Sequence, residues 1–238
     1  MKNRFIYLIS IIYLITATTL FAQTKRYEVK SAVINYKITG SGSMMGMPTK
    51  LSGNKTLYFK NNGAIELSKE QRVQMIMGQE EKEDEIVKFD NGVIYSVDEE
   101  EKVIYKQTIS KEQETIYFNQ DGEKGLKSLG GVKVGSEKIA GYKCDIWDLS
   151  GVSMCIYKGI PLKIKTETMG IIETQIATKV QLNISIDENK FKLPNYPIRT
   201  IKDIMEENQK QMEDLSPEQQ KMMEEMMKSM GEMFDPEK

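Results

Sequence analysis

The stretch IETQIATKVQLNISI, residues 172–186, decides the fold class of this chain. Its even positions carry isoleucine, valine, leucine or threonine, whereas its odd positions are mostly charged or amide side chains. Alternation with a period of two is typical of a strand with one buried face. A strand of 15 residues would span near 50 Å at about 3.3 Å per residue, so it must curve or contain a bulge. The stretch therefore predicts a long, curved sheet with one apolar face.

The rest of the chain up to about residue 197 shows the same period, which favours many antiparallel strands. The predicted strands are 27–38, with a phase slip at 32–34, and 55–60, 65–67, 72–77, 85–89, 93–97, 103–107 and 114–118. KNNGA (60–64) and FDNGV (89–93) place Asn-Gly between two runs, which predicts hairpins with type I′ turns. Residues 121–131 predict a short helix, and the glycine-rich segment 40–54 predicts a flexible connection with exposed or loosely packed methionines.

The N-terminus has the three-part layout of a secretory signal. Lys2 and Arg4 precede an apolar run, and small residues lead to Ala22. We expect cleavage after Ala22, which leaves a protein that is periplasmic or secreted. Leu20 is bulky for the third position before the cut, so an uncleaved anchor is the alternative. No cysteine follows the apolar run, which argues against a lipid attachment site.

Composition excludes several function classes. Without Lys2 and Arg4, 31 basic residues face 35 acidic ones, a formal charge of −4, and nucleic acid binding needs a concentrated basic face. The chain contains no histidine, the commonest general base and zinc ligand. No pair of carboxylates stands out, and the acidic runs QEEKEDE and DEEEK are interpreted as solvated surfaces. We therefore expect no enzymatic activity, no catalytic residue and no cofactor.

The C-terminal region 198–238 changes to a helical pattern. Thr200 is the expected N-cap of a first helix, and Ser216 with Pro217 starts a second one. The second helix carries a methionine stripe, which consists of Met222, Met223, Met226, Met227, Met230 and Met233. Three interpretations stay open: packing onto the sheet or the neighbouring helix, recognition of a hydrophobic partner, and Cu(I) binding by thioethers, to which the methionines of MMGM at 44–47 could add.

The two cysteines lie in GYKCDIWDLSGVSMCIYKG on either side of a turn expected at 148–151. If that turn joins two strands in register, Cys144 and Cys155 lie opposite each other. Exported cysteines that can meet usually form a disulfide. The spacing predicts a structural bridge rather than a redox site, which favours C-x-x-C at a helix start.

A family resemblance rests on GSEKIAGYKC at 135–144, Trp147, MCIYKGIPLK at 154–163 and FKLP at 191–194. These motifs resemble an exported bacterial family called domain of unknown function 4412. The resemblance implies a fold similar to the lipoprotein-carrier group, a curved antiparallel half-barrel with helices over its concave apolar face. It covers roughly residues 27–197 and brings no established activity.

Together these patterns predict three segments: a signal peptide at 1–22, an antiparallel β domain at 23–197 and a methionine-rich helical tail at 198–238. We expect an exported, non-enzymatic protein that binds a lipid, an acylated protein or an apolar peptide on its concave sheet. The methionine stripe would act as a lid, with transient membrane or lipoprotein contact possible. The alternative is a Cu(I)-handling protein that uses the same six methionines.

Overall fold

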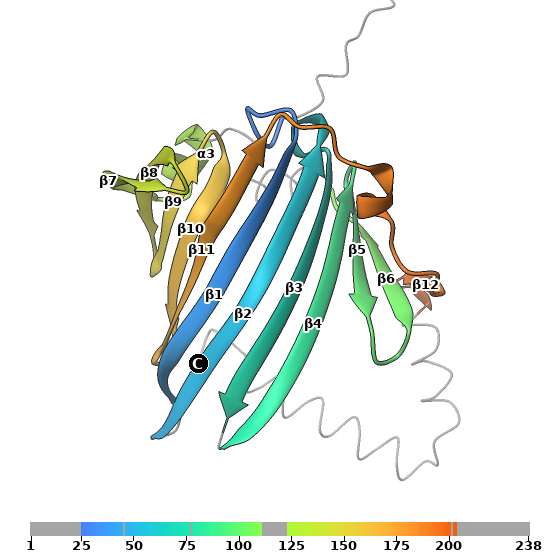
Figure 1. The fold of residues 1–238 in the computed structure, drawn as a ribbon, viewed down its shortest axis with the longest axis horizontal. Helices are drawn as coiled ribbons and strands as arrows, with labels where there is room; N and C mark the ends of the chain where they lie inside the picture. The colour runs from blue at the N-terminus through green and yellow to red at the C-terminus, as the bar shows by residue number, and fades with distance from the viewer. Residues whose placement is uncertain (1–24, 45, 77, 111–122, 201, 204–238) are drawn as a thin grey trace, which may run out of the picture.

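The computed structural model describes residues 25–44, 46–76, 78–110, 123–200 and 202–203. Within these residues the chain forms a single curved sheet of twelve strands in the order β12-β6-β5-β4-β3-β2-β1-β11-β10-β9-β8-β7 (Figure 1). Every neighbouring pair is antiparallel except β12 and β6, which run in parallel. The predicted fold class, mainly β with an open curved antiparallel sheet, is confirmed for this part of the chain.

The strands are β1 (Ala32–Met44), β2 (Met47–Lys60), β3 (Ile65–Ile76), β4 (Gln79–Asp90), β5 (Val93–Asp98), β6 (Val103–Thr108), β7 (Val132–Ile139), β8 (Tyr142–Leu149), β9 (Val152–Tyr157), β10 (Ile160–Thr168), β11 (Ile171–Leu182) and β12 (Ile198–Thr200). The helical elements are α3 (Glu123–Ser128) and the 3-10 turns η1 (Asn61–Gly63) and η2 (Glu188–Phe191). The short helix expected in 121–131 is therefore present as α3. None of the helices in the described ranges is long and apolar enough to cross a membrane.

The segment 40–54 is not a flexible connection, so this prediction is wrong. It forms the end of β1 and the start of β2, and the two strands pair from Ala32 opposite Phe59 to Met44 opposite Met47. Gly40, Gly42 and Gly53 serve close packing, whereas Gly46 lies in the turn with a φ of 80°. A Cβ atom on Gly42 would collide with the carbonyl oxygen of Gly170, between β10 and β11. Close backbone approach is one of the reasons for which a strand needs glycine.

Several predicted strands are longer than their apolar pattern indicated. Strand β3 joins the predicted strands 65–67 and 72–77, and β4 begins at Gln79 instead of residue 85. In both strands the added residues are largely polar, and pairing with neighbours extends the ladder through them. FDNGV forms the expected two-residue turn, with φ of 49° at Asn91 and 87° at Gly92. KNNGA also joins a hairpin, but by a four-residue loop, and the strand predicted at 114–118 lies outside the described residues.

Strand β11 contains the bulge that its length required. Asn35 pairs with Lys179 and Tyr36 pairs with Ala177, so Thr178 is the extra residue. The bulge reverses which positions of β11 share a face with Tyr36. Odd positions do so before Thr178, and even positions do so after it. The prediction that all even positions form one apolar face is therefore wrong for the first half of the strand.

Strand β11 ends four residues earlier than predicted. Asn183 has a φ of 54°, its backbone N–H donates to the Ser31 carbonyl, and its side chain accepts from the Lys30 N–H. Asparagine tolerates this left-handed conformation better than most residues, which explains the end of the strand. The N-terminal segment before β1 is held by a loop contact, because the Tyr27 N–H donates to the Asn62 carbonyl in η1. Strand β1 therefore starts at residue 32 rather than at the predicted residue 27.

The main core lies where the sheet curls back on itself. It joins Ala32, Ile34, Tyr36, Leu57 and Phe59 of β1 and β2 with Ile139, Cys144, Cys155, Ile160 and Leu162 of β7–β10. Strand β7 also contacts β11, although three strands separate them in the sheet order. The face of β1 and β2 that carries these core residues is thus the inside of the curve. We call it the inner face.

Cys144 on β8 and Cys155 on β9 form the predicted disulfide, with Cα atoms 5.3 Å apart. The expected register is wrong by one residue on each strand. Leu149 pairs with Val152 at the turn, so Ile146 rather than Cys144 faces Cys155. The cysteines are diagonal neighbours, which side chains on one face can still bridge. Both are buried in the main core.

After β11 the chain crosses the sheet through η2 and rejoins it as β12. The Asp187 carboxylate accepts from the Asn189 N–H at 2.9 Å, and Phe191 is buried beneath the Lys60 ammonium, 4.9 Å from its ring centre. The break predicted at KLPNYPI is present, but the parallel strand β12 that follows it was not predicted. The Thr200 hydroxyl accepts from the Asp203 N–H at 3.2 Å, which is the N-cap hydrogen bond expected of Thr200.

Candidate functional site

The inner face of β1 and β2 divides into two parts. The core end, residues 32–36 of β1 and 57–60 of β2, faces the main core. The turn end, residues 37–44 of β1 and 47–56 of β2, leads to the β1–β2 turn. At the turn end, Gly40 lies opposite Leu51 and Glu173, and Gly53 lies opposite Ile38 and Arg72. The inner face is therefore apolar at one end and mixed at the other, which corrects the prediction of an apolar concave face.

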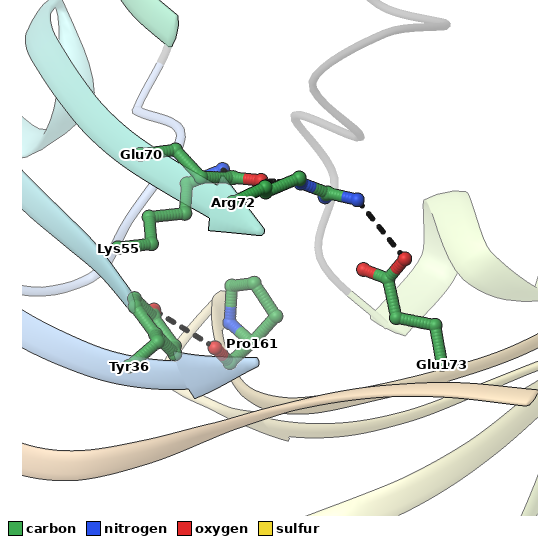
Figure 2. Close-up of polar contacts among 6 residues, drawn as sticks. All are labelled: Tyr36, Lys55, Glu70, Arg72, Pro161 and Glu173. Atoms are coloured by element: carbon green, nitrogen blue, oxygen red, sulfur yellow. Dashed lines mark hydrogen bonds and ion pairs between the residues drawn. The ribbon is translucent and has the colours of Figure 1, made fainter. Parts of the chain in front are cut away.

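Four charged side chains form an ionic row at the turn end: Lys55, Glu70, Arg72 and Glu173 (Figure 2). The Lys55 ammonium lies 3.2 Å from the Glu70 carboxylate, and the Arg72 guanidinium pairs with the same carboxylate. A second nitrogen of Arg72 lies 3.0 Å from Glu173. Their charges alternate in sign along the row, so each interior member has two partners of opposite charge.

Burial makes the ionic row energetically significant. The Glu70 side chain is only 3% exposed, whereas Arg72 and Glu173 are 32% and 26% exposed. Burial is the largest single influence on the pKa of Arg72 and lowers it, but the hydrogen bond and charge of Glu70, joined by Glu173, outweigh burial and raise the pKa overall. Arg72 therefore stays charged. A buried carboxylate with two cationic partners is satisfied, but removal of one partner leaves it poorly compensated.

The Arg72–Glu173 ion pair connects strands that are not neighbours. Strands β2 and β1 lie between β3 and β11, and three strand spacings amount to about 14 Å on a flat sheet. Long side chains and the curvature toward the inner face bring the two charges together. Beneath the pair, the positions next to Arg72 and Glu173 are Gly53 and Gly40, which carry no side chain that would separate them.

Two buried tyrosines mark the core end. The Tyr36 hydroxyl donates to the Pro161 carbonyl at 3.0 Å, which ties β1 to β10 (Figure 2). The Tyr27 hydroxyl donates to the Glu66 carboxylate at 2.7 Å, and Arg26 forms an ion pair with Glu66 at 3.3 Å. Burial first, and then the charge of Glu66, raises the pKa of both tyrosines. These contacts close the core end with the chain's own side chains.

A groove lies on strands β1–β4 beside the β1–β2 turn. It has a volume of about 790 Å³, and its apolar lining consists of Met47, Pro48, Leu51, Val73 and Met75. Most of the lining, Val73, Met75 and Glu80 included, alternates in the register with the positions of the ionic row, so it lies on the opposite face of the sheet. Ligand sites usually measure about 300–1,000 Å³ and are mostly apolar with a few polar groups. The groove fits this description.

The residues predicted to bind a ligand lie mostly outside the part of the chain that the structure describes. Met222, Met223, Met226, Met227, Met230 and Met233 lie outside the described residues, as does the signal peptide, so the lid, the Cu(I) site and the cleavage site stay predictions. Met47 of MMGM lines the groove and is 37% exposed, in line with the expectation of exposed methionines there. In the described ranges, no group of three or more histidine, cysteine, aspartate or glutamate side chains could hold a metal ion.

Sequence reasoning missed the ionic row. The alternation of residues 172–186 predicts that Glu173 lies on the polar face of its strand. Instead Glu173 shares the inner face with Gly40, because the bulge at Thr178 changes which positions of β11 point inward. Lys55, Glu70 and Arg72 look like ordinary solvated charges in the sequence. The available signal was the alternation of Glu70 and Arg72 at i and i+2 on one strand, which places both on one face.

Comparisons with known proteins add little to this geometry. No family model and no curated protein matches the chain, so membership of the family named above stays a prediction. Solved structures with partial likeness include an uncharacterized conserved protein from Thermus thermophilus, with 7% identity and a TM-score of 0.39 over 70% of this chain and 90% of that one.

Two further structures align over similar lengths. LprF from Mycobacterium bovis shows 8% identity and a TM-score of 0.35 over 72% of this chain and 93% of that one. A putative outer membrane lipoprotein-sorting protein domain from Vibrio parahaemolyticus shows 12% identity and a TM-score of 0.24 over 71% and 93%.

Proposed function

We propose that this chain is an exported, non-enzymatic protein that binds a hydrophobic ligand in the groove beside the β1–β2 turn. The observation that carries the proposal is the apolar groove of about 790 Å³ lined by Met47, Leu51, Val73 and Met75. Methionine side chains adapt to ligands of different shape, so such a lining suits a lipid chain, an acylated protein or an apolar peptide. The disulfide Cys144–Cys155 supports export, because disulfides persist in oxidising compartments.

The groove lining also supplies polar groups. Lys50, Ser52 and Glu80 line it beside the apolar residues. A ligand with an apolar chain and a polar end could place the chain against Val73 and Met75 and the polar end beside Lys50 or Glu80. An amphiphile such as a lipid or an acylated peptide thus fits this lining better than a purely apolar molecule.

We extend the proposal to the methionine-rich tail, which would cover the groove in the absence of ligand. The amphipathic pattern of residues 216–234 supports this role, since its stripe of six methionines needs an apolar surface. Exchange of one apolar surface for another changes the buried area little, so ligand and tail could replace each other.

Native mass spectrometry of the protein purified from its exported fraction tests the proposal. We expect a co-purifying lipid-sized mass that is lost in the variant Met47→Gln/Met75→Gln. Met169→Gln is the matched control, because Met169 is 84% exposed and does not line the groove. A lipid-sized mass that survives in the groove variant would contradict the site.

A truncation after Asp203 tests the lid while it keeps β12 and the Thr200 cap. We expect increased binding of a hydrophobic dye, and this increase should be absent when Met47→Gln/Met75→Gln is added. Unchanged dye binding after truncation would exclude the lid. Copper that co-purifies with the full chain and is lost when the six tail methionines become leucine would instead favour metal handling, because leucine keeps the apolar volume.

A further inference from the structure

Among the described strands, the first half of β4 is an open edge of the sheet. Residues Gln79–Asp90 pair with β3 along the whole strand, but only Ile86–Asp90 pair with β5. Within the described ranges, residues 79–85 have no strand on their other side. At about 3.3 Å per residue this edge is about 23 Å long. An unpaired edge presents a row of backbone N–H and C=O groups that can pair with another strand.

The edge has space beside it. A groove of about 530 Å³ lies between β4 and the β5–β6 hairpin. Its lining includes Glu83 and Glu85 of β4, Ser96 and Asp98 of β5, and Tyr105 of β6. Side chains 79–85 are exposed throughout. A strand that added to β4 would therefore begin in this groove at residue 85 and run along the exposed half of the strand.

The charge of this edge is strongly negative. Residues 79–85, which we call the acidic edge, hold Glu80, Glu81, Glu83, Asp84 and Glu85 against the single Lys82, a net charge of −4. Lys82 already pairs with Glu80 at 3.2 Å. Among the ion pairs between described residues, none involves the other four carboxylates. A strand docked here would bring its own charges within cross-strand distance of these carboxylates, where opposite charges stabilise a pair and like charges destabilise it.

We propose that the acidic edge docks an extended segment of a partner protein that is rich in lysine or arginine, by strand addition to β4. The backbone edge supplies the hydrogen bonds, and the carboxylates select the charge of the occupant. A second copy of the same edge is excluded, because five carboxylates would face five others. The chain's own C-terminal tail is also a poor occupant: residues 204–238 hold ten acidic side chains against four lysines.

Acidic side chains on a sheet edge also prevent a protein from aggregating with itself, because like charges repel each other. The same repulsion would exclude acidic strands from the proposed docking site. The two roles differ in what they predict for a cationic strand. An edge that serves protection alone gains nothing from a cationic peptide beyond diffuse attraction, which does not order the backbone. Strand addition must protect from hydrogen exchange those backbone amides of residues 79–85 that point away from β3.

The experiment uses the full mature chain and an eight-residue fluorescent peptide with lysine at alternate positions and threonine or valine between them. The control peptides replace lysine by glutamate or place proline at the centre. We expect saturable binding of the lysine peptide by fluorescence anisotropy at low salt, at least tenfold weaker binding of both controls, and slower amide exchange confined to 79–85. Binding should weaken as salt rises, because exposed charges are screened.

Variants distinguish a specific edge from overall charge. Glu81→Gln/Glu83→Gln/Glu85→Gln should weaken binding at least tenfold, whereas Glu28→Gln/Asp148→Asn/Glu167→Gln removes the same charge from exposed positions elsewhere and should weaken it less than threefold. The single variant Glu83→Gln gives the same comparison if the triple variant folds poorly. Equal loss in both triples, equal binding of the glutamate peptide, or binding without protection of 79–85 would overturn the proposal.

Discussion

The core end and the turn end belong to the same strands and the same face, yet different interactions hold them. At the core end, Leu57 and Phe59 pack against β7–β10 and the disulfide, in a cluster of apolar side chains. At the turn end, six residues earlier on β2, Leu51 lies beside glycines and an ionic row. The core end is closed by the protein's own apolar side chains, whereas the turn end carries charged groups, and a groove lies beside it on the β1–β2 turn side of strands β1–β4.

This difference separates stability from binding within one sheet. Tight apolar packing at the core end fixes the curvature, since core packing has few voids and resists change. The turn end inherits that curvature and can carry charged groups that packing alone would not favour. If the two ends are held differently, matched substitutions at each end should change the free energy of unfolding by different amounts.

The largest expected contrast compares two leucines on the inner face of β2. Leu57 and Leu51 are 6% and 8% exposed, but only Leu57 belongs to the main core cluster. We expect Leu57→Ala to lower the free energy of unfolding by about 3–4 kcal/mol and Leu51→Ala by about half as much, because fewer apolar neighbours are lost. Urea unfolding followed by circular dichroism measures both. Equal losses would show that the ends are packed alike.

Removal of the disulfide should affect the core end nearly as much. The cysteines are 11 residues apart in sequence, and the loop-entropy estimate for such a ring is about 3 kcal/mol. We therefore expect Cys144→Ala/Cys155→Ala to lower the free energy of unfolding by about 3 kcal/mol. Ligand binding in the groove should persist under conditions where the variant is folded. Loss of binding in the folded variant would show that the ends are coupled.

The ionic row should give a smaller, graded effect at the turn end. Arg72→Met removes one of the two cationic partners of buried Glu70 and should lower the free energy of unfolding by about 2 kcal/mol. Glu173→Gln, at the partly exposed end of the row, should lower it by less than about 1 kcal/mol. The double variant measures the coupling between them. A coupling near zero would mean that the pair across β1 and β2 contributes no stability.

High pH should act on the core end through its tyrosines. Burial first, and then Glu66, raises the folded-state pKa of Tyr27 and Tyr36 above the ordinary value of 10.0. In the unfolded chain both ionise near pH 10, so the unfolded state then binds fewer protons than the folded state. Stability is complete below pH 10 and falls above it, by about 1.4 kcal/mol per pH unit for each tyrosine.

Chemical unfolding at pH 8, 10 and 11 measures this slope, and Tyr36→Phe should make it shallower. The Tyr36→Phe variant should also be slightly less stable than the wild type at pH 8, because it lacks the hydrogen bond to the Pro161 carbonyl. A slope that is unchanged in Tyr36→Phe would contradict the assignment of this pH dependence to the core end.

Much of the sheet could be predicted because its information is local. The alternation in 172–186 predicted a strand that must curve or contain a bulge, and FDNGV predicted its own turn. The cysteine spacing predicted the disulfide but not its register, since a shift of the turn by one residue leaves the cysteines diagonal and still within reach. The extended lengths of β2, β3 and β4 were not predictable from apolar residues, because ladder pairing continues through polar side chains.

The charged inner face was less predictable, because the face on which a residue of a bulged strand lies depends on how that strand pairs with its partner. Glu173 shares a face with Tyr36 only because Thr178 is extra, and the position of that residue follows from pairing with β1. The glycines of segment 40–54 showed the same limit. Their composition indicates flexibility, whereas a close backbone approach from another strand is the actual reason for Gly42.

By itself the sequence determined the class of fold, the disulfide and the alternation of apolar and polar residues, because side-chain period and turn chemistry act between residues a few positions apart. Only the tertiary structure decided which charges meet on the inner face, where the groove lies and which part of β4 has no second neighbour among the described strands. These features depend on curvature and register, which arise when strands more than a hundred residues apart in sequence, such as β3 and β11, are brought together by packing at the core end.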